Sequence, residues 1–263
     1  MRDDKLKKLY IENYSNTEFV YEQDVYEYLK DVSAFLRFYN ERDRWKYKNP
    51  AYDTMGYLKM WEKHIQELIM ELFNSFVYGN FLSVSAMTRT LMECYVYVSI
   101  MKKEQSQELL DEWWICNLIH KVSSAAHTEA GKKQIDNIKL YCELRNIDFE
   151  EKWNYYTKYA KKEHGWLRTL MGNQSIGFQA LCKYIGEEDI YSDYESANAY
   201  VHGQDIATKL LSFTFYCTIY VRLYLMMQYI FKAIRLFETD EEMEDWMLEL
   251  EAGLIELADT YLE

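Results

Sequence analysis

Arg89 and Glu93 form the first part of a set of side chains that could carry chemistry. They lie four positions apart in a run of otherwise apolar and small residues from Val84 to Met101. Residues four apart lie on the same face of a helix, so an ion pair is expected there. Charges within so apolar a helix are costly unless they are paired. The spacing therefore predicts a paired guanidinium and carboxylate on one helix.

A second set of polar residues lies about a hundred positions later, between Tyr191 and Gly203. Tyr194, Asn198 and His202 recur at four-residue intervals, so one face of a helix would carry all three. His202 lies near the expected end of that helix, where the helix dipole favours an imidazolium. This face predicts a hydroxyl, an amide and an imidazole in one row.

The two sets would form an acid–base site if their helices met. His202 could then act as a general acid or base, while Arg89 binds a phosphate or stabilises negative charge. Glu93 would hold Arg89 in place, and Ser196 and Asn198 would orient the substrate or the imidazole. The alternative is structural: Arg89–Glu93 is a buried pair whose spare donors satisfy the helix that carries His202.

A third pattern resembles a metal site. Glu112, Cys116 and His120 follow at four-residue steps, and His127 lies seven positions beyond. All three residue types bind zinc, but the outer two would be about 12 Å apart along a helix. The spacing favours a core cysteine beside a hydrogen-bonded histidine, and no metal or cofactor is expected. Glu-x-x-His, phosphate-loop, G-x-S-x-G and H-E-x-x-H motifs are all missing from the sequence.

Taken in order, these motifs resemble a bacterial family of all-helical domains of unknown function. The pattern is R-x-x-x-E, a loop containing tryptophan, and Y-x-x-x-x-S-x-x-x-x-V-H-G, and it covers about residues 81–205. The matching positions are Arg89, Glu93, Trp166, Tyr191 or Tyr194, Ser196, His202 and Gly203. Within this pattern the candidate substrate-binding residues are Trp166, Arg168 and Tyr194.

More distantly, a helix that ends in a histidine is similar to the HEPN-type domains. Many of those domains are ribonucleases of toxin and phage-defence systems, which would imply an RNA or nucleotide substrate. Their motif places an arginine before the histidine, with four to six residues between. Glu195, Ser196 and Ala197 occupy those positions here. Metal-independent RNA cleavage therefore requires Arg89 to replace the missing arginine from another helix.

The elements that carry these residues are predicted to be helices. The 263 residues include one proline and nine glycines, so there are few breakers. We expect an all-α fold, an irregular multi-helix bundle of about eight to eleven helices in a single domain over residues 1–263. Apolar periodicity places the helices at about 18–42, 52–78, 81–103, 107–126, 129–145, 149–162, 175–185, 191–201, 205–237 and 240–263. On the first helix the apolar stripe consists of Phe19, Tyr26, Leu29, Val32, Phe35, Leu36 and Tyr39.

The net charge of −13 is concentrated at the C-terminus. Residues 236–263 contain 11 acidic residues and neither lysine nor arginine, whereas residues 1–235 carry 32 acidic and 30 basic residues. No broad basic face for nucleic acid is visible. Residues 239–263 predict an acidic amphipathic helix whose apolar stripe consists of Met243, Trp246, Met247, Leu250, Leu254, Leu257 and Tyr261. This helix either packs on its own domain or binds a protein partner, including a second copy in a homodimer.

The cysteines and the apolar runs indicate the compartment. The five cysteines are widely spaced and form no C-x-x-C pair, which is typical of reduced thiols. The first residues lack an apolar signal segment, and the longest candidate membrane span, the twelve uncharged residues Leu210–Val221, ends at Arg222. We expect a cytoplasmic protein with no membrane span. The leading hypothesis is a non-catalytic interaction or regulatory domain of a bacterial protein with a defence or stress role. The alternative is a HEPN-like ribonuclease or nucleotide-acting enzyme that uses His202 and Arg89.

Overall fold

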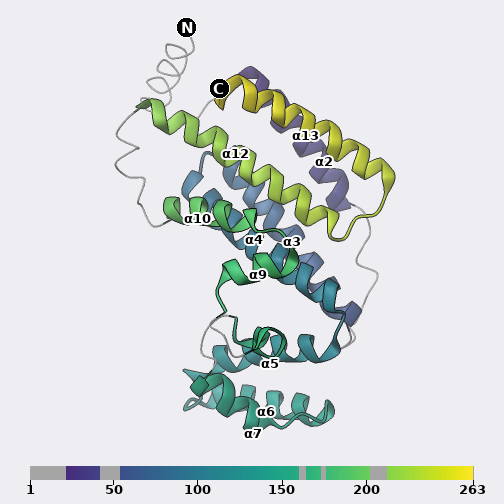
Figure 1. The fold of residues 1–263 in the computed structure, drawn as a ribbon, viewed down its shortest axis with the longest axis vertical. Coiled ribbons are helices and arrows are strands. Elements are labelled where there is room, and N and C mark those ends of the chain that lie inside the picture. Colours follow the sequence, from purple (N-terminus) through teal and green to yellow (C-terminus); the bar gives the residue numbers. More distant parts are fainter. Residues whose placement is uncertain (1–21, 42–53, 160–163, 173–175, 202–211, 263) are drawn as a thin grey trace. The chain divides into compact units, whose positions relative to one another are not determined.

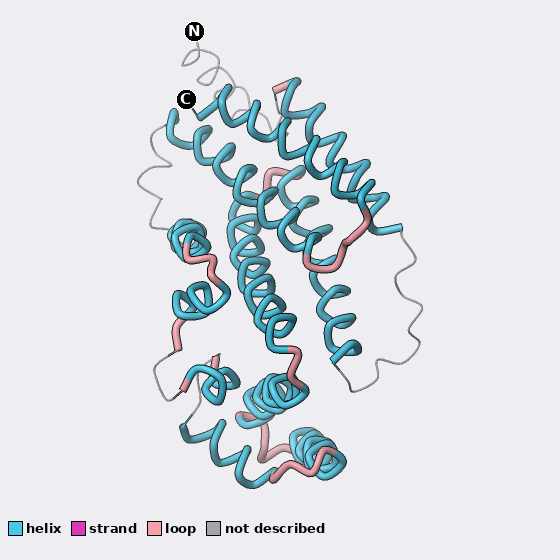
Figure 2. Tube along the Cα trace, turned by 45° about the vertical axis from the view of Figure 1, so that its right-hand side comes forward, coloured by secondary structure: helices cyan, strands magenta, loops and turns pink. Residues whose placement is uncertain are grey.

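The computed structural model describes residues 22–41, 54–159, 164–172, 176–201 and 212–262 (Figure 1). Within these ranges every regular element is a helix and there is no strand (Figure 2), which confirms the all-α class. The α-helices are α2 (Gln23–Glu41), α3 (Thr54–Val77), α4 (Phe81–Glu104), α5 (Gln107–Ser123), α6 (Glu129–Leu144), α7 (Phe149–Asn154), α8 (Arg168–Met171), α9 (Phe178–Ile185), α10 (Asp189–Val201), α12 (Ser212–Arg235) and α13 (Glu241–Leu262). A π-helical turn, η1 (Tyr155–Tyr159), and a 3-10 turn, η2 (Gly165–Leu167), complete them.

The chain divides into two compact units. Unit 1 comprises Met1–Pro50, Leu58–Ser99 and Glu187–Glu263, and unit 2 comprises Ala51–Tyr57 and Ile100–Gly186. The sequence predicts a single domain over residues 1–263 with a core at 81–205. The boundary at Ser99 falls inside α4, so residues of that predicted core contribute to both units.

In unit 1, α12 and α13 form an antiparallel hairpin, and α2 lies along α13 (Figure 1). The core-facing residues of α12 include Met226, Ile230 and Phe231, all with side chains fully withdrawn from solvent. Phe35 of α2 packs edge-on against both Phe231, at 6.2 Å between ring centroids, and Trp246, at 5.4 Å. Aromatic pairs of this geometry add stabilisation beyond the area that they bury. The three helices therefore share one aromatic and aliphatic core.

The acidic helix α13 packs on its own unit. Its buried residues are Met243, Met247, Leu250, Leu254 and Leu257, which all belong to the apolar stripe expected from the sequence. Arg235, the last residue of α12, donates from Nε to Glu244 and from Nη1 and Nη2 to the two carboxylate oxygens of Glu251, at 2.6 and 2.9 Å. This two-pronged contact with Glu251 fixes the end of α12 against α13.

Unit 2 is built around α5, on which η1, η2, α6 and α7 pack. Three of its helices begin with a side chain that accepts from the first-turn backbone: Ser106 for α5, Thr128 for α6 and Asp148 for α7. Gly131 lies so close to the Ala125 carbonyl that a Cβ would be 2.0 Å from its oxygen. Only glycine fits at this first turn of α6.

Among the described helices, none combines the length and the apolar character that a membrane crossing requires.

Candidate functional site

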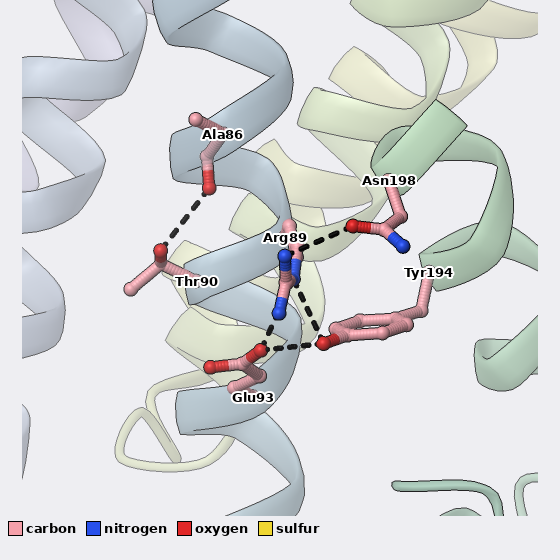
Figure 3. A network of polar contacts seen from close by, with 6 residues as sticks. All are labelled: Ala86, Arg89, Thr90, Glu93, Tyr194 and Asn198. Atoms are coloured by element: carbon pink, nitrogen blue, oxygen red, sulfur yellow. Dashed lines mark hydrogen bonds and ion pairs between the residues drawn. The ribbon is translucent and has the colours of Figure 1, made fainter. Parts of the chain in front are cut away.

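The two predicted polar sets meet inside unit 1 (Figure 3). Arg89 of α4 donates from Nε to Glu93 Oε1 at 3.2 Å and to the Tyr194 hydroxyl at 2.8 Å. Its Nη1 donates to Asn198 Oδ1 at 2.9 Å. The Tyr194 hydroxyl in turn donates to Glu93 Oε1 at 2.8 Å. These four residues, Arg89, Glu93, Tyr194 and Asn198, form what we call the Arg89 cluster.

Helix geometry explains why these residues converge. Arg89 and Glu93 form the ion pair that their four-residue spacing predicts, and Tyr194 and Asn198 follow each other on one face of α10. The Arg89 guanidinium also lies 4.8 Å from the centre of the Tyr194 ring, within cation–π range. The cluster is thus a polar bridge from α4 to α10.

The surroundings of Arg89 and Tyr194 favour a charged guanidinium and a neutral hydroxyl. The side chains of Arg89 and Glu93 are 29% and 23% exposed, so solvent screens the pair only in part. Burial lowers the pKa of Arg89, but Tyr194 and Glu93 outweigh it, and the pKa is raised overall. Burial, together with the hydrogen bond to Glu93, raises the pKa of Tyr194 to about 12. At neutral pH, Arg89 is charged and Tyr194 is a neutral donor.

Some N–H groups of the Arg89 guanidinium could bind a further group. A guanidinium has five N–H groups, and those on Nη2, with one on Nη1, contact no acceptor in the described part of the chain. Because Arg89 is more than a quarter exposed, an anion could approach those groups. The chemistry open to the cluster is therefore anion binding by a guanidinium whose charge Glu93 already balances.

The remaining candidates on α10 do not join the cluster. Ser196 is exposed, and its hydroxyl donates to the Ser192 carbonyl of its own helix at 3.0 Å. Tyr191, the other tyrosine that fits the family pattern, donates to Glu195 at 2.9 Å. His202 and Gly203 lie outside the described residues. Tyr194 is thus the tyrosine that reaches Arg89.

Trp166 and Arg168, expected as substrate-binding residues, belong to unit 2. Trp166 is 1% exposed in η2, which packs on α5, and its backbone N–H donates toward the Cys116 thiol. Arg168 begins α8 and is half-buried. Their substrate-binding role stays a prediction, and the observed role of Trp166 is core packing.

The metal-like stripe on α5 has other partners. Cys116 Sγ lies 3.8 Å from His120 Nδ1, as expected for a core cysteine beside a histidine. Burial, with a smaller contribution from Glu112, raises the pKa of Cys116 to about 12, so the thiol is protonated and a poor metal ligand. Glu112 instead accepts from Lys152 and Tyr156. The described residues contain no cluster of three metal-ligating side chains.

A polar network in unit 2 was not among the sequence-based candidates. Asp111 is 7% exposed and accepts from Tyr141 at 2.6 Å, Gln107 at 3.0 Å and Arg145 at 3.1 Å. It lines a cavity of about 560 Å³ together with Glu104, Glu112, Arg145 and Lys152. Only the Gln107–Asp111 spacing on one helix is visible in the sequence, because Tyr141 belongs to α6 and Arg145 directly follows it.

An apolar groove in unit 1 was also missed. The α2–α3 groove, of about 950 Å³, lies between α2 and the C-terminal end of α3. Its walls carry four exposed large hydrophobic side chains: Tyr26 (56%), Phe38 (39%), Val77 (37%) and Tyr78 (78%). Lys30 and Arg37 of α2 line it as well. The sequence places Tyr26 on the apolar stripe of its helix, whereas the structure places it at the solvent side.

Comparisons with known proteins identify no relative of this chain. No family model matches the chain, and no curated protein or solved structure is similar to it.

Proposed function

We propose that this chain is a non-catalytic interaction domain that binds an amphipathic helix in the α2–α3 groove. The observation that carries the proposal is the gathering of Tyr26, Phe38, Val77 and Tyr78 in one groove while most other large apolar side chains are buried. Contiguous exposed apolar surface bordered by polar residues is typical of a binding site.

The form of the groove favours a helix over a small molecule. Lining residues run along α2 from Gln23 to Glu41, which corresponds to about 27 Å at 1.5 Å per residue. This length fits about five turns of a partner helix. The apolar side chains come from two walls, as in grooves that take the apolar face of an amphipathic helix.

The contacts within the Arg89 cluster support a structural role for this second candidate site. Its four side chains bond to one another and join α4 to α10. Ion pairs of this kind more often hold helices together than perform chemistry.

Photo-crosslinking tests the proposal. A photoreactive phenylalanine analogue in place of Tyr78 should give one discrete adduct in cells, which mass spectrometry would map to a helical segment. The matched control carries the analogue in place of Leu144, which is 75% exposed on α6 of unit 2 and should give no such adduct. The same diffuse adducts from both positions would overturn the proposal.

A second candidate function is favoured by the open N–H groups of Arg89. If the cluster binds a phosphate, His202, which directly follows α10 in the sequence, would supply the general acid or base. RNA and nucleotide turnover would then be lost in His202→Ala and kept in Thr90→Ala, since the exposed Thr90 hydroxyl donates to the Ala86 carbonyl of its own helix. Equal turnover in these variants and the wild type would exclude this role for His202.

A further inference from the structure

The outer face of α13 is another place in unit 1 where large apolar side chains are exposed, besides the groove and the exposed Met60 and Leu82. Leu248 and Ile255 are 51% and 54% exposed, and the exposed Ala252 lies between them at helical spacing. We call Leu248, Ala252 and Ile255 the α13 ridge. The ridge lies on the side of the helix opposite the buried stripe, so packing within unit 1 does not use it.

We infer that the α13 ridge of one chain docks in the α2–α3 groove of a second copy. This inference rests on the proposed function, because it names the helix that the groove binds. In the described part of the chain, the groove and the ridge hold six of the ten exposed large hydrophobic side chains. The two surfaces would bury one another's apolar area.

Charge complementarity argues for this occupant. Exposed acids flank the ridge, namely Asp245, Glu249, Glu256 and Asp259, and none of them has an ion pair with a described residue. Like charges at helical spacing, such as Asp245 and Glu249, repel each other, so a cationic partner surface would stabilise them.

Two of the three charged residues that line the groove, Lys30 and Arg37, carry the opposite charge, and the third is Glu41 at its end. Arg37 is exposed on the groove wall and has no ion pair among the described residues. Among the described residues Lys30 pairs with Glu27 alone, at 3.3 Å, and both of these side chains are at least half exposed. An acidic helix laid along α2 would bring carboxylates to both cations, which sets its register and orientation.

Both surfaces belong to unit 1, so two copies related by a two-fold axis would make the contact twice. This reciprocity permits a test in which two defective chains repair each other. The ridge variant is Leu248→Asp with Ile255→Asp, and the groove variant is Tyr26→Glu with Tyr78→Glu. All four residues are more than half exposed, so the monomer should stay folded.

Sedimentation velocity of the purified full chain measures the result. The wild type should be a dimer. Each variant alone should be a monomer, because the dissociation constant (Kd) of its dimer should exceed that of the wild type more than about 30-fold. An equimolar mixture of the two variants should recover dimers, because the intact ridge of one chain still fits the intact groove of the other. The control Leu140→Asp with Leu144→Asp, two exposed positions on α6, should dimerise like the wild type.

Three outcomes would overturn the inference: a monomeric wild type, variants that dimerise normally, or a mixture that stays monomeric. Circular dichroism verifies that each variant keeps its helix content. The photo-crosslink from position 78 then separates the two proposals. An adduct with another protein would leave the groove as a binding site and refute self-association, whereas the absence of any adduct would refute both.

Discussion

Arg89 is held by side chains from its own helix and from α10, and the cost of removing it depends on what is left behind. The Arg89→Met variant would leave the Glu93 carboxylate three-quarters buried without its counterion. We expect the free energy of unfolding to fall by about 1–2 kcal/mol, below the value for a fully buried pair because solvent screens this one. Urea denaturation measures the difference.

The double variant Arg89→Met with Glu93→Gln supplies the control. It removes both charges, so it should be more stable than Arg89→Met alone. If Arg89→Met is as stable as the wild type, the cluster does not hold α10 to α4. In that case the N–H groups of Arg89 that contact no acceptor in the described part of the chain would support anion binding as its role.

Tyr194 makes part of the stability depend on pH. Its pKa is raised to about 12 in the folded chain, against an ordinary value of about 10. A raised pKa means that the unfolded chain loses this proton first, so the contribution is complete below pH 10 and is lost as the pH rises to 12. In urea titrations from pH 9 to 12, Tyr194→Phe should lose less stability than the wild type. Parallel curves would show that Tyr194 is not perturbed by Glu93.

At the scale of the element, α13 allows two faces of one helix to be compared. Trp246 contacts Phe35 at 5.4 Å and Phe38 at 5.8 Å between ring centroids, while Leu248 points to solvent. We expect Trp246→Glu to lower the free energy of unfolding by about 3 kcal/mol or more, and Leu248→Glu to change it by less than about 0.5 kcal/mol. Thermal unfolding at a concentration that keeps the chain monomeric distinguishes them. Equal losses would mean that the outer face is also buried.

The helices could be predicted because their signals are local. Few breakers and steady apolar periodicity place α4 and α10 to within two residues of their observed ends. The predicted helix at 149–162 is observed as α7 followed by the π-helical turn η1, a change of hydrogen-bond register that periodicity does not reveal.

The candidate site could be predicted only one helix at a time. Four-residue spacing correctly placed Arg89 with Glu93, and Tyr194 with Asn198, on common faces. The meeting of the two faces joins residues more than a hundred positions apart, which no local pattern encodes. The groove was hidden for another reason. A tyrosine suits both a core and a solvent-facing wall, so Tyr26 on an apolar stripe does not reveal its exposure.

At the scale of the whole molecule, the division into two units raises the question of whether they unfold together. Unit 2 contains its own buried polar centre, in which Asp111 accepts from Tyr141 and Arg145. Asp111→Ala would remove the carboxylate that accepts from the buried Tyr141 hydroxyl and from the partly exposed Arg145, at a cost of about 2 kcal/mol. The matched control is Asp136→Ala on α6, because Asp136 is exposed.

Hydrogen exchange followed by mass spectrometry shows which helices lose stability in this variant. If the units open separately, Asp111→Ala should speed exchange in α5 and α6 and leave α12 and α13 at the wild-type rate, because local opening is governed by local stability. Faster exchange in all four helices would instead mean that the chain opens as one cooperative body. The first result would make unit 1, with both its groove and its ridge, the part of the chain in which a helix-binding function should be sought.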